Sequence, residues 1–240
     1  MRQPAIPRST RIETRQTLSE IAAETIRADI IAGVFKPGDR LTMGALQECY
    51  GLSMSPLREA LAGLAVEQFV VFEGRRGYQV APMSLADLHD LTETRKLLEA
   101  DIARLALAHG DEVWESKVIA TFHQLSYTEQ QNIAEGRRGG DKQWEERNAA
   151  FHDAISEACP LRWLKAMRMQ IFMKAQRYRA MAWLKHRDSR TVAEEHREIF
   201  EAVMARDEKR VVSAIGVHIG NVAVYAQEFV RCDAPPPSIK

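Results

Sequence analysis

Apolar side chains in the second two thirds of the chain recur every three or four residues, which is the spacing of one face of an α-helix. No stretch of this region shows the alternating pattern of a strand. The helical pattern is interrupted near Gly110, at residues 135–140, at Pro160, at residues 186–189 and near Asp207. These interruptions predict six consecutive helices that pack as an all-helical bundle.

Four of these helical stripes contain a polar residue where an apolar one is expected, namely Arg95, Asn148, His196 and His218. His152 lies one turn after Asn148 and can face the same direction. A single polar residue in a stripe is usually a hydrogen-bonded core residue. Burying unpaired guanidinium or imidazole groups is unfavourable, so such groups on four helices are expected to share partners. The sequence therefore predicts one polar cavity at the centre of the bundle.

Three imidazoles that converge on one point provide a site for a divalent metal, zinc before nickel, with room for water or a ligand oxygen. We expect His152, His196 and His218 to form this site and Asn148 to face it. Arg95 would then lie nearby and bind a carboxylate through two parallel hydrogen bonds.

Two further residues are weaker candidates for contact with a small ligand. Asn221 lies one turn after His218, and Tyr178 lies on the helix expected from about residue 161 to 183. Taken singly, each is more often a packing or surface residue. The run Lys174–Arg179 around Tyr178 is expected to be mostly a solvated face.

A short helix pattern, a tight turn and a second helix follow one another in the first third of the chain. The shorter helix spans residues 43–50 and ends at Gly51, a residue tolerant of positive φ. Pro56 suits the first turn of the second helix, which Ser53 or Ser55 can cap. Two helices joined in this way place the first residues of the second helix against base edges in the major groove of DNA.

The exposed candidates for base contact on that helix are Ser53, Met54, Ser55 and Arg58. Arg58 is the strongest of them, because a guanidinium can donate two hydrogen bonds to O6 and N7 of guanine. The alternative interpretation is a surface arginine paired with a carboxylate such as Glu59 or Glu67.

Two strand patterns, at residues 69–72 and 78–80, flank a tight loop directly after this helix. The candidates for phosphate or minor-groove contact at the loop tip are Arg75, Arg76 and Gly77. A basic loop tip is often only solvated, but here it follows a candidate recognition helix. With a further helix expected at residues 17–32, the order of elements predicts a winged helix-turn-helix.

Several spaced motifs resemble those of the GntR family of bacterial transcription regulators. They are Ile30-Ile31-Ala32-Gly33, Lys36-Pro37-Gly38-Asp39-Arg40-Leu41, Ser53-Met54-Ser55-Pro56-Leu57-Arg58-Glu59-Ala60-Leu61 and Gly74-Arg75-Arg76-Gly77. The resemblance implies a regulator that binds operator DNA. Relatives usually carry a DNA-contacting arginine where this chain has Met54, which can offer only apolar contact, for example to a thymine methyl group.

Residues 83–231 resemble the FadR-type effector domain, the all-helical FCD domain. Many such domains bind a divalent metal through an aspartate and three histidines, with the pattern Asp-x-x-Phe-His before two later histidines. Here the pattern is Asn148-Ala149-Ala150-Phe151-His152, followed by His196 and His218. A neutral amide oxygen is a weaker ligand than a carboxylate, so the resemblance implies a zinc site dominated by histidine rather than a manganese site. Arg95 matches an arginine common on the first helix of this domain.

Composition changes this picture in two respects. The 240 residues carry a formal net charge of zero, so DNA affinity must come from the local placement of cations and from dimerisation. The three cysteines are isolated, which argues against a disulfide framework or a cysteine zinc site and fits a reducing cytoplasm. No apolar run approaches the ~20 residues of a membrane span, so we expect a soluble cytoplasmic protein.

The expected fold is mainly α, with a winged helix-turn-helix at residues 13–82 and a six-helix, FCD-like effector-binding and dimerisation domain at residues 83–232. Residues 1–12 are expected to form a disordered arm and residues 233–240 a flexible tail. The expected function is that of a homodimeric repressor on an inverted-repeat operator in double-stranded DNA, released by a small carboxylate-bearing metabolite. Two alternatives stand beside it: a metal-dependent hydrolase in which the histidines activate water, and a structural histidine cluster without metal.

Overall fold

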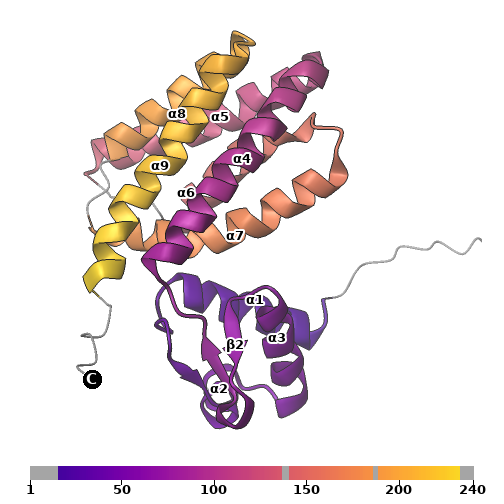
Figure 1. Ribbon diagram of the computed structural model, residues 1–240, viewed down its shortest axis with the longest axis vertical. Coiled ribbons are helices and arrows are strands. Elements are labelled where there is room, and N and C mark those ends of the chain that lie inside the picture. Colours follow the sequence, from indigo (N-terminus) through magenta and orange to yellow (C-terminus); the bar gives the residue numbers. More distant parts are fainter. Residues whose placement is uncertain (1–15, 137–140, 186–188, 233–240) are drawn as a thin grey trace, which may run out of the picture.

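The computed structural model describes residues 16–136, 141–185 and 189–232. Figure 1 shows a small N-terminal part and, above it, a bundle of long helices. The expected mainly α class is confirmed. The expected arm at residues 1–12 and the expected tail at residues 233–240 lie outside the described residues.

The N-terminal part contains helices, one 3-10 turn and short strands in the order α1 (Leu18–Ile31), β1 (Arg40–Leu41), α2 (Met43–Tyr50), α3 (Met54–Val66), β2 (Val70–Phe72), η1 (Gly74–Arg76) and β3 (Tyr78–Val80). The strands form an antiparallel sheet in the order β1-β3-β2, in which Phe72 lies opposite Tyr78. The predicted winged helix-turn-helix is thereby confirmed. Strand β1 was not predicted, because two residues are too few to show an alternating pattern.

Local sequence explains where these helices begin and end. The Thr17 hydroxyl accepts from the Glu20 backbone N–H, while the Glu20 carboxylate accepts from the Thr17 N–H, so the two residues form a capping box for α1. Gly51 ends α2 in the left-handed region, with φ of 64°. Ser53 takes the capping position of α3 but makes no side-chain capping bond, and the Ser55 hydroxyl lies 3.4 Å from the Glu59 carboxylate instead.

One apolar core holds the N-terminal part together. Helix α1 packs against α3, and the sheet covers their common face. The largest fully buried side chains of this core are Ile26, Leu46, Leu57, Leu61, Leu64 and Phe69. The orientation of α3 is therefore fixed by its buried face, which leaves the opposite face free for contacts with other molecules.

The bundle consists of α4 (Leu85–His109), α5 (Glu112–Ala134), α6 (Lys142–Glu157), α7 (Arg162–Lys185), α8 (Ser189–Met204) and α9 (Glu208–Cys232). All six helices were predicted, and the interruptions in the sequence pattern fall between them. Side chains at the helix starts explain three of the boundaries: Ser84, Asp111 and Asp141 each accept a hydrogen bond from a backbone N–H in the first turn of the helix that follows.

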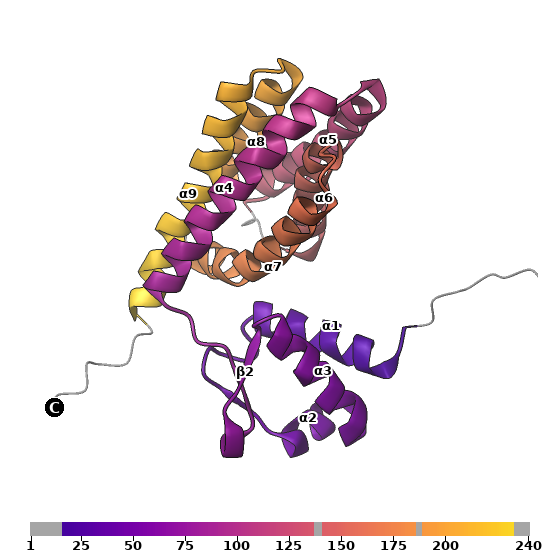
Figure 2. The same ribbon diagram turned by 45° about the vertical axis from the view of Figure 1, so that its right-hand side comes forward.

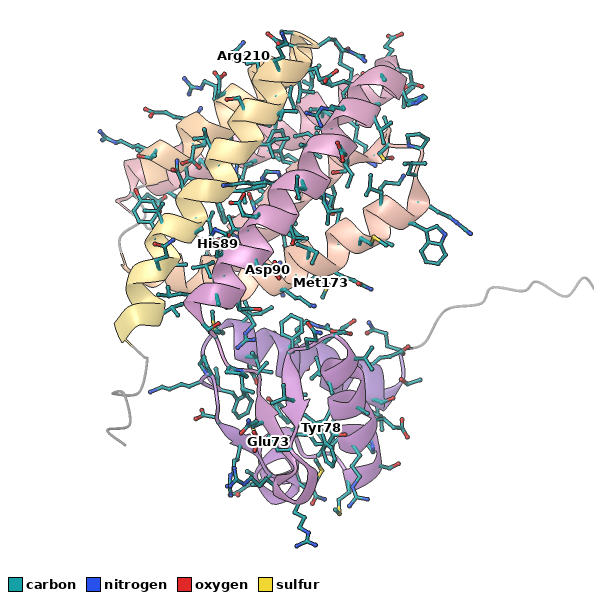
Figure 3. The ribbon with its side chains drawn as sticks, viewed as in Figure 1. Glu73, Tyr78, His89, Asp90, Met173 and Arg210 are labelled. Carbon is teal, nitrogen blue, oxygen red and sulfur yellow. The ribbon has the colours of Figure 1, made fainter. Side chains whose placement is uncertain are left out.

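Helix α7 lies between the rest of the bundle and the N-terminal part (Figure 2). It packs against α4 and α9 on one side and contacts α1 on the other. Met173, which Figure 3 labels on the side of α7 toward the N-terminal part, packs against the winged-helix core. In the part of the chain that the structure describes, no helix is long and apolar enough to cross a membrane.

Candidate functional site

The three predicted histidines come together inside the bundle. His152 on α6, His196 on α8 and His218 on α9 are 4%, 0% and 3% exposed. Their ring centroids are separated by 5.5 Å (His152–His196), 5.2 Å (His152–His218) and 4.7 Å (His196–His218). One ring nitrogen from each lies within 4.8 Å of the other two. The structure therefore brings the three predicted histidines together, and their role as metal ligands stays a prediction.

Two of these histidines are oriented by carboxylates that the sequence analysis did not find. His196 Nδ1 lies 2.7 Å from Glu129 Oε1 on α5, and His218 Nδ1 lies 2.7 Å from Glu195 Oε2 on α8. An ionised carboxylate only accepts hydrogen bonds, so each histidine donates its Nδ1–H to its glutamate. In the neutral ring, the lone pair therefore lies on Nε2. This arrangement is the one that a metal-binding imidazole requires.

Several polar atoms of the predicted metal ligands lack a protein partner. His152 Nε2, His196 Nε2 and Asn148 Oδ1 are buried and make no hydrogen bond with any residue that the structure describes. Burying unpaired polar atoms is costly, and a cation bound among the imidazoles would satisfy the ring nitrogens. Three converging imidazoles match the preferences of zinc or nickel. The residues present thus fit a divalent metal.

The environment keeps His152 in the form that can bind a metal. Burial lowers the pKa of His152 well below its usual value, and positive charge at the neighbouring histidines and at Arg95 and Arg168 lowers this pKa further. The neutral imidazole therefore prevails at neutral pH. Asn148 is 1% exposed and adds no charge of its own.

Arg95 is buried beside two arginines from α7 that the sequence analysis missed. The guanidinium carbons of Arg95, Arg168 and Arg179 lie 5.0, 5.4 and 4.9 Å from the centre of the Phe172 ring. Glu99 accepts a hydrogen bond from Arg168 Nε at 2.9 Å and a longer, weaker one from Arg95 Nε at 3.5 Å. Burial, followed by repulsion from the other two arginines, lowers the pKa of Arg95 to about 10. Arg95 is therefore a buried cation near His152, and its one ion pair among the described residues is a long contact with Glu99.

The run Lys174–Arg179 was expected to be mostly solvated, and this expectation is wrong. Four of its six residues are buried, with Ala175, Arg177, Tyr178 and Arg179 at 6%, 8%, 3% and 2% exposed. Helix α7 is covered on two sides, by α4 and α9 and by the N-terminal part. A helix covered on two sides lacks the broad polar face of a surface helix, on which the expectation was based.

The two weaker candidates have partners within the protein. The Tyr178 hydroxyl donates to Asp87 Oδ2 at 2.6 Å, near the start of α4. Asn221 Nδ2 donates to Glu195 Oε1 at 2.7 Å. Asn221 thus supports the carboxylate that orients His218.

The residues predicted to contact DNA form an exposed surface at the start of α3 and at the tip of the β2–β3 loop. The exposed members are Ser53, Met54, Ser55, Arg58, Arg75 and Arg76, and Gly77 beside them is partly buried. Arg58 makes no ion pair with any described residue, and its alternative partner Glu67 instead binds Arg27 through bonds of 2.6 to 3.0 Å. The contact of Arg76 with Glu73 is long, at 3.4 Å.

A winged helix joined to a helical bundle with a buried histidine site defines a DNA-binding regulator with a candidate ligand-binding domain. Two family models match the chain in that order: bacterial regulatory proteins of the gntR family over residues 18–80 and the FCD domain over residues 90–221. The chain belongs to the GntR family of bacterial transcription regulators and carries an FCD domain. It is therefore a DNA-binding transcription regulator and not an enzyme, and the hydrolase alternative is not supported.

Similar proteins agree with this assignment. The HTH-type transcriptional regulator BphR of Paraburkholderia xenovorans is 32% identical over 89% of this chain and 87% of its own length. The HTH-type transcriptional repressor GlaR of Escherichia coli is 36% identical over 81% of this chain and 89% of its own length. The solved structure of Escherichia coli McbR/YncC has a TM-score of 0.71 at 19% identity and covers 90% of this chain and 100% of that protein, which shows a shared fold.

Proposed function

We propose that the protein is a metal-containing repressor that a small carboxylate-bearing metabolite releases from its operator. The observation that supports this proposal most directly is the buried group of His152, His196 and His218, in which ring nitrogens of His152 and His196 have no partner among the described residues. A transcription regulator needs no such group for its fold. A site for a metal and its ligand accounts for it.

The metal would be held by His152, His196 and His218, with Asn148 as a further oxygen donor. Zinc is preferred and nickel is a second choice, because the donors are three imidazoles and a neutral amide. The metal, when bound, would supply a Lewis-acidic position for an anionic oxygen. Glu129 and Glu195 would hold two of the rings in place from behind.

Arg95 would bind the carboxylate of the metabolite. Its guanidinium is buried, lies over the Phe172 ring and has one ion pair among the described residues, a long contact of 3.5 Å to Glu99, so it can turn to an incoming anion at little cost. Arg168 and Arg179 lie against the same ring, and each is paired with carboxylates of the protein. A neutral analogue of the metabolite would gain none of these interactions.

In a homodimer, each protomer would place α3 in a major groove and the β2–β3 loop against the adjacent backbone, so that the operator is an inverted repeat. The Escherichia coli relative GlaR is a transcriptional repressor. The metabolite would release the DNA only if it binds more tightly to the arrangement of the two α3 helices that does not fit the operator. A ligand with equal affinity for both arrangements would change nothing.

The test begins with DNA fragments selected from a random library by the untagged, zinc-loaded protein. A panel of small mono- and dicarboxylic acids, together with the corresponding primary amides, is then assayed for release of the selected DNA. We expect at least one acid to release the DNA from the wild-type protein and its amide to have no effect. Release by the amides, or equal release from the wild-type protein and an Arg95→Leu variant, would refute the proposed anchoring of the carboxylate.

A further inference from the structure

Helix α7 carries two sets of side chains with different surroundings. One set, Arg168, Phe172 and Arg179, lies beside the histidine site, and the centres of the Phe172 and His152 rings are 6.3 Å apart. The other set, Met173, Lys174 and Arg177, meets the winged-helix part. Both sets occur within three turns of one continuous helix, so a movement of one set moves the other.

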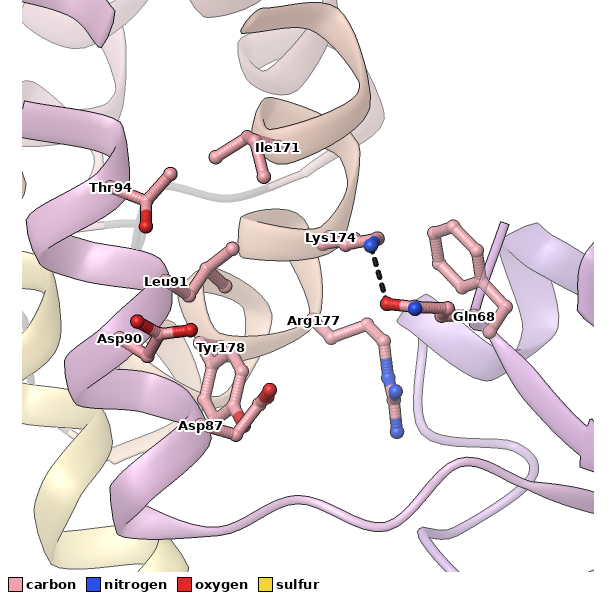
Figure 4. Close-up of a pocket in the computed structure, with 10 residues that line it drawn as sticks. Gln68, Asp87, Asp90, Leu91, Thr94, Ile171, Lys174, Arg177 and Tyr178 are labelled. Carbon is pink, nitrogen blue, oxygen red and sulfur yellow. Dashed lines mark hydrogen bonds between the residues drawn. The ribbon is translucent and has the colours of Figure 1, made fainter. Parts of the chain in front are cut away.

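The second set forms specific bonds. Lys174 Nζ donates to Gln68 Oε1 at 2.6 Å, as Figure 4 shows, and Arg177 Nη2 donates to the backbone carbonyl of Ala81 at 2.6 Å. Gln68 and Arg177 also line a small pocket between the two parts, together with Phe69 and Asp87. These hydrogen bonds therefore connect α7 to two separate points of the winged-helix part, Gln68 and Ala81.

These two points meet at the base of the wing. Gln68 lies between α3 and β2 in the left-handed region, with φ of 61°, a conformation that is uncommon for a residue other than glycine. The next residue, Phe69, accepts at its carbonyl from the Ala81 N–H at 3.0 Å. Lys174 and Arg177 thus hold the two chain segments that fix the direction of α3 and of the wing.

We propose that α7 transmits occupancy of the histidine–arginine site to the DNA-binding surface, with Lys174 and Arg177 as the positioning residues. This inference rests on the proposed function of that site. Arg168 is paired with Glu99 and Asp153, and Arg179 is paired with Glu145. A divalent cation beside the histidines repels the guanidinium groups and attracts their carboxylate partners, and a bound carboxylate does the reverse, so occupancy changes the forces on α7. Helix movements of about 1–2 Å are usual in such transitions, and a displacement of that size breaks hydrogen bonds of this length.

Hydrogen–deuterium exchange of the full-length, untagged protein with and without Zn²⁺ tests the inference. In the wild-type protein, zinc is expected to change the exchange of peptides within residues 67–81, although these residues do not contact the site. In Lys174→Met and Arg177→Met, zinc should bind as tightly as before, while its effect on residues 67–81 is lost. Lys174→Arg, which keeps a donor, should retain the effect.

A matched control lies on the same helix. Lys165 donates to the Glu157 carbonyl and does not bond to the winged-helix part, so Lys165→Met should behave as wild type. Zinc binding without any change at residues 67–81 of the wild-type protein would refute transmission through α7, and so would an unchanged effect in both methionine variants. Absence of zinc binding would instead refute the proposed function of the site, which calorimetry distinguishes from the first two results.

Discussion

His196 and His218 lie with their ring centres 4.7 Å apart, and each turns its Nδ1 to a different glutamate. Glu129 on α5 orients His196, and Glu195 on α8 orients His218. Helix α5 thus contributes to the site although none of its residues belongs to the histidine group. The carboxylates fix which nitrogen of each ring is available at the centre of the bundle.

Glu195→Gln should weaken zinc binding by about 10- to 100-fold, because the amide no longer attracts the Nδ1 proton of His218 as a carboxylate does. Competition with a chromophoric chelator measures the change. Glu194→Gln, on the neighbouring exposed residue, is the control and should bind zinc as wild type. Equal affinities for all three proteins would show that Glu195 does not act on the metal site.

Asn148→Asp should raise the affinity for divalent metals by about tenfold or more, because a carboxylate adds a negative charge beside the cation at short distance. The increase should be largest for Mn²⁺, which prefers oxygen ligands with charge. Calorimetric titration with Mn²⁺ and Zn²⁺ measures it, with Gln143→Glu on the exposed face of the same helix as control. An unchanged Mn²⁺ affinity would remove residue 148 from the set of metal ligands.

Arg58→Ala should weaken operator binding by about 1–3 kcal/mol, or roughly 5- to 150-fold, if its guanidinium contacts a base. Its melting temperature should not change, because Arg58 is exposed and has no ion pair with a described residue. Fluorescence anisotropy with the selected operator measures the affinity. Arg104→Ala, on the bundle, removes the same charge elsewhere and should bind DNA normally. Equal loss in both variants would indicate a nonspecific effect of charge.

Arg95→Leu should fold with little loss of stability, since Glu99 keeps the 2.9 Å bond from Arg168. Arg168→Leu should be less stable by about 3–5 kcal/mol, because the buried Glu99 then keeps only the weak contact with Arg95. Urea unfolding measures both values. A larger loss for Arg95→Leu than for Arg168→Leu would mean that Arg95 is the main structural partner of Glu99 and not an anchor for a ligand.

Much of the architecture could be predicted because it follows from local patterns. Breaks in the apolar spacing marked all six helices of the bundle, and the polar residues in its stripes identified His196, His218 and Arg95. His152 was identified because it lies one turn after Asn148, a polar residue in the stripe of its own helix. Partners from other helices could not be found in this way. Glu195 follows its own helix pattern next to His196 but binds His218. Arg168 and Arg179 are buried against carboxylates of other helices, Glu99 on α4 and Glu145 on α6, which the pattern of α7 does not show. A stripe shows which side of a helix is buried and not which residue lies opposite.

The metal content of the untagged protein, measured together with its melting temperature before and after chelation, shows whether the buried histidines hold a metal. We expect close to one zinc or nickel ion per protomer and a melting temperature that falls when a chelator removes the ion. A variant with alanine at His196 and His218 should contain no metal and should melt at the same temperature with and without chelator. Wild-type protein without bound metal, and with a melting temperature that neither chelator nor added zinc changes, would refute the metal site.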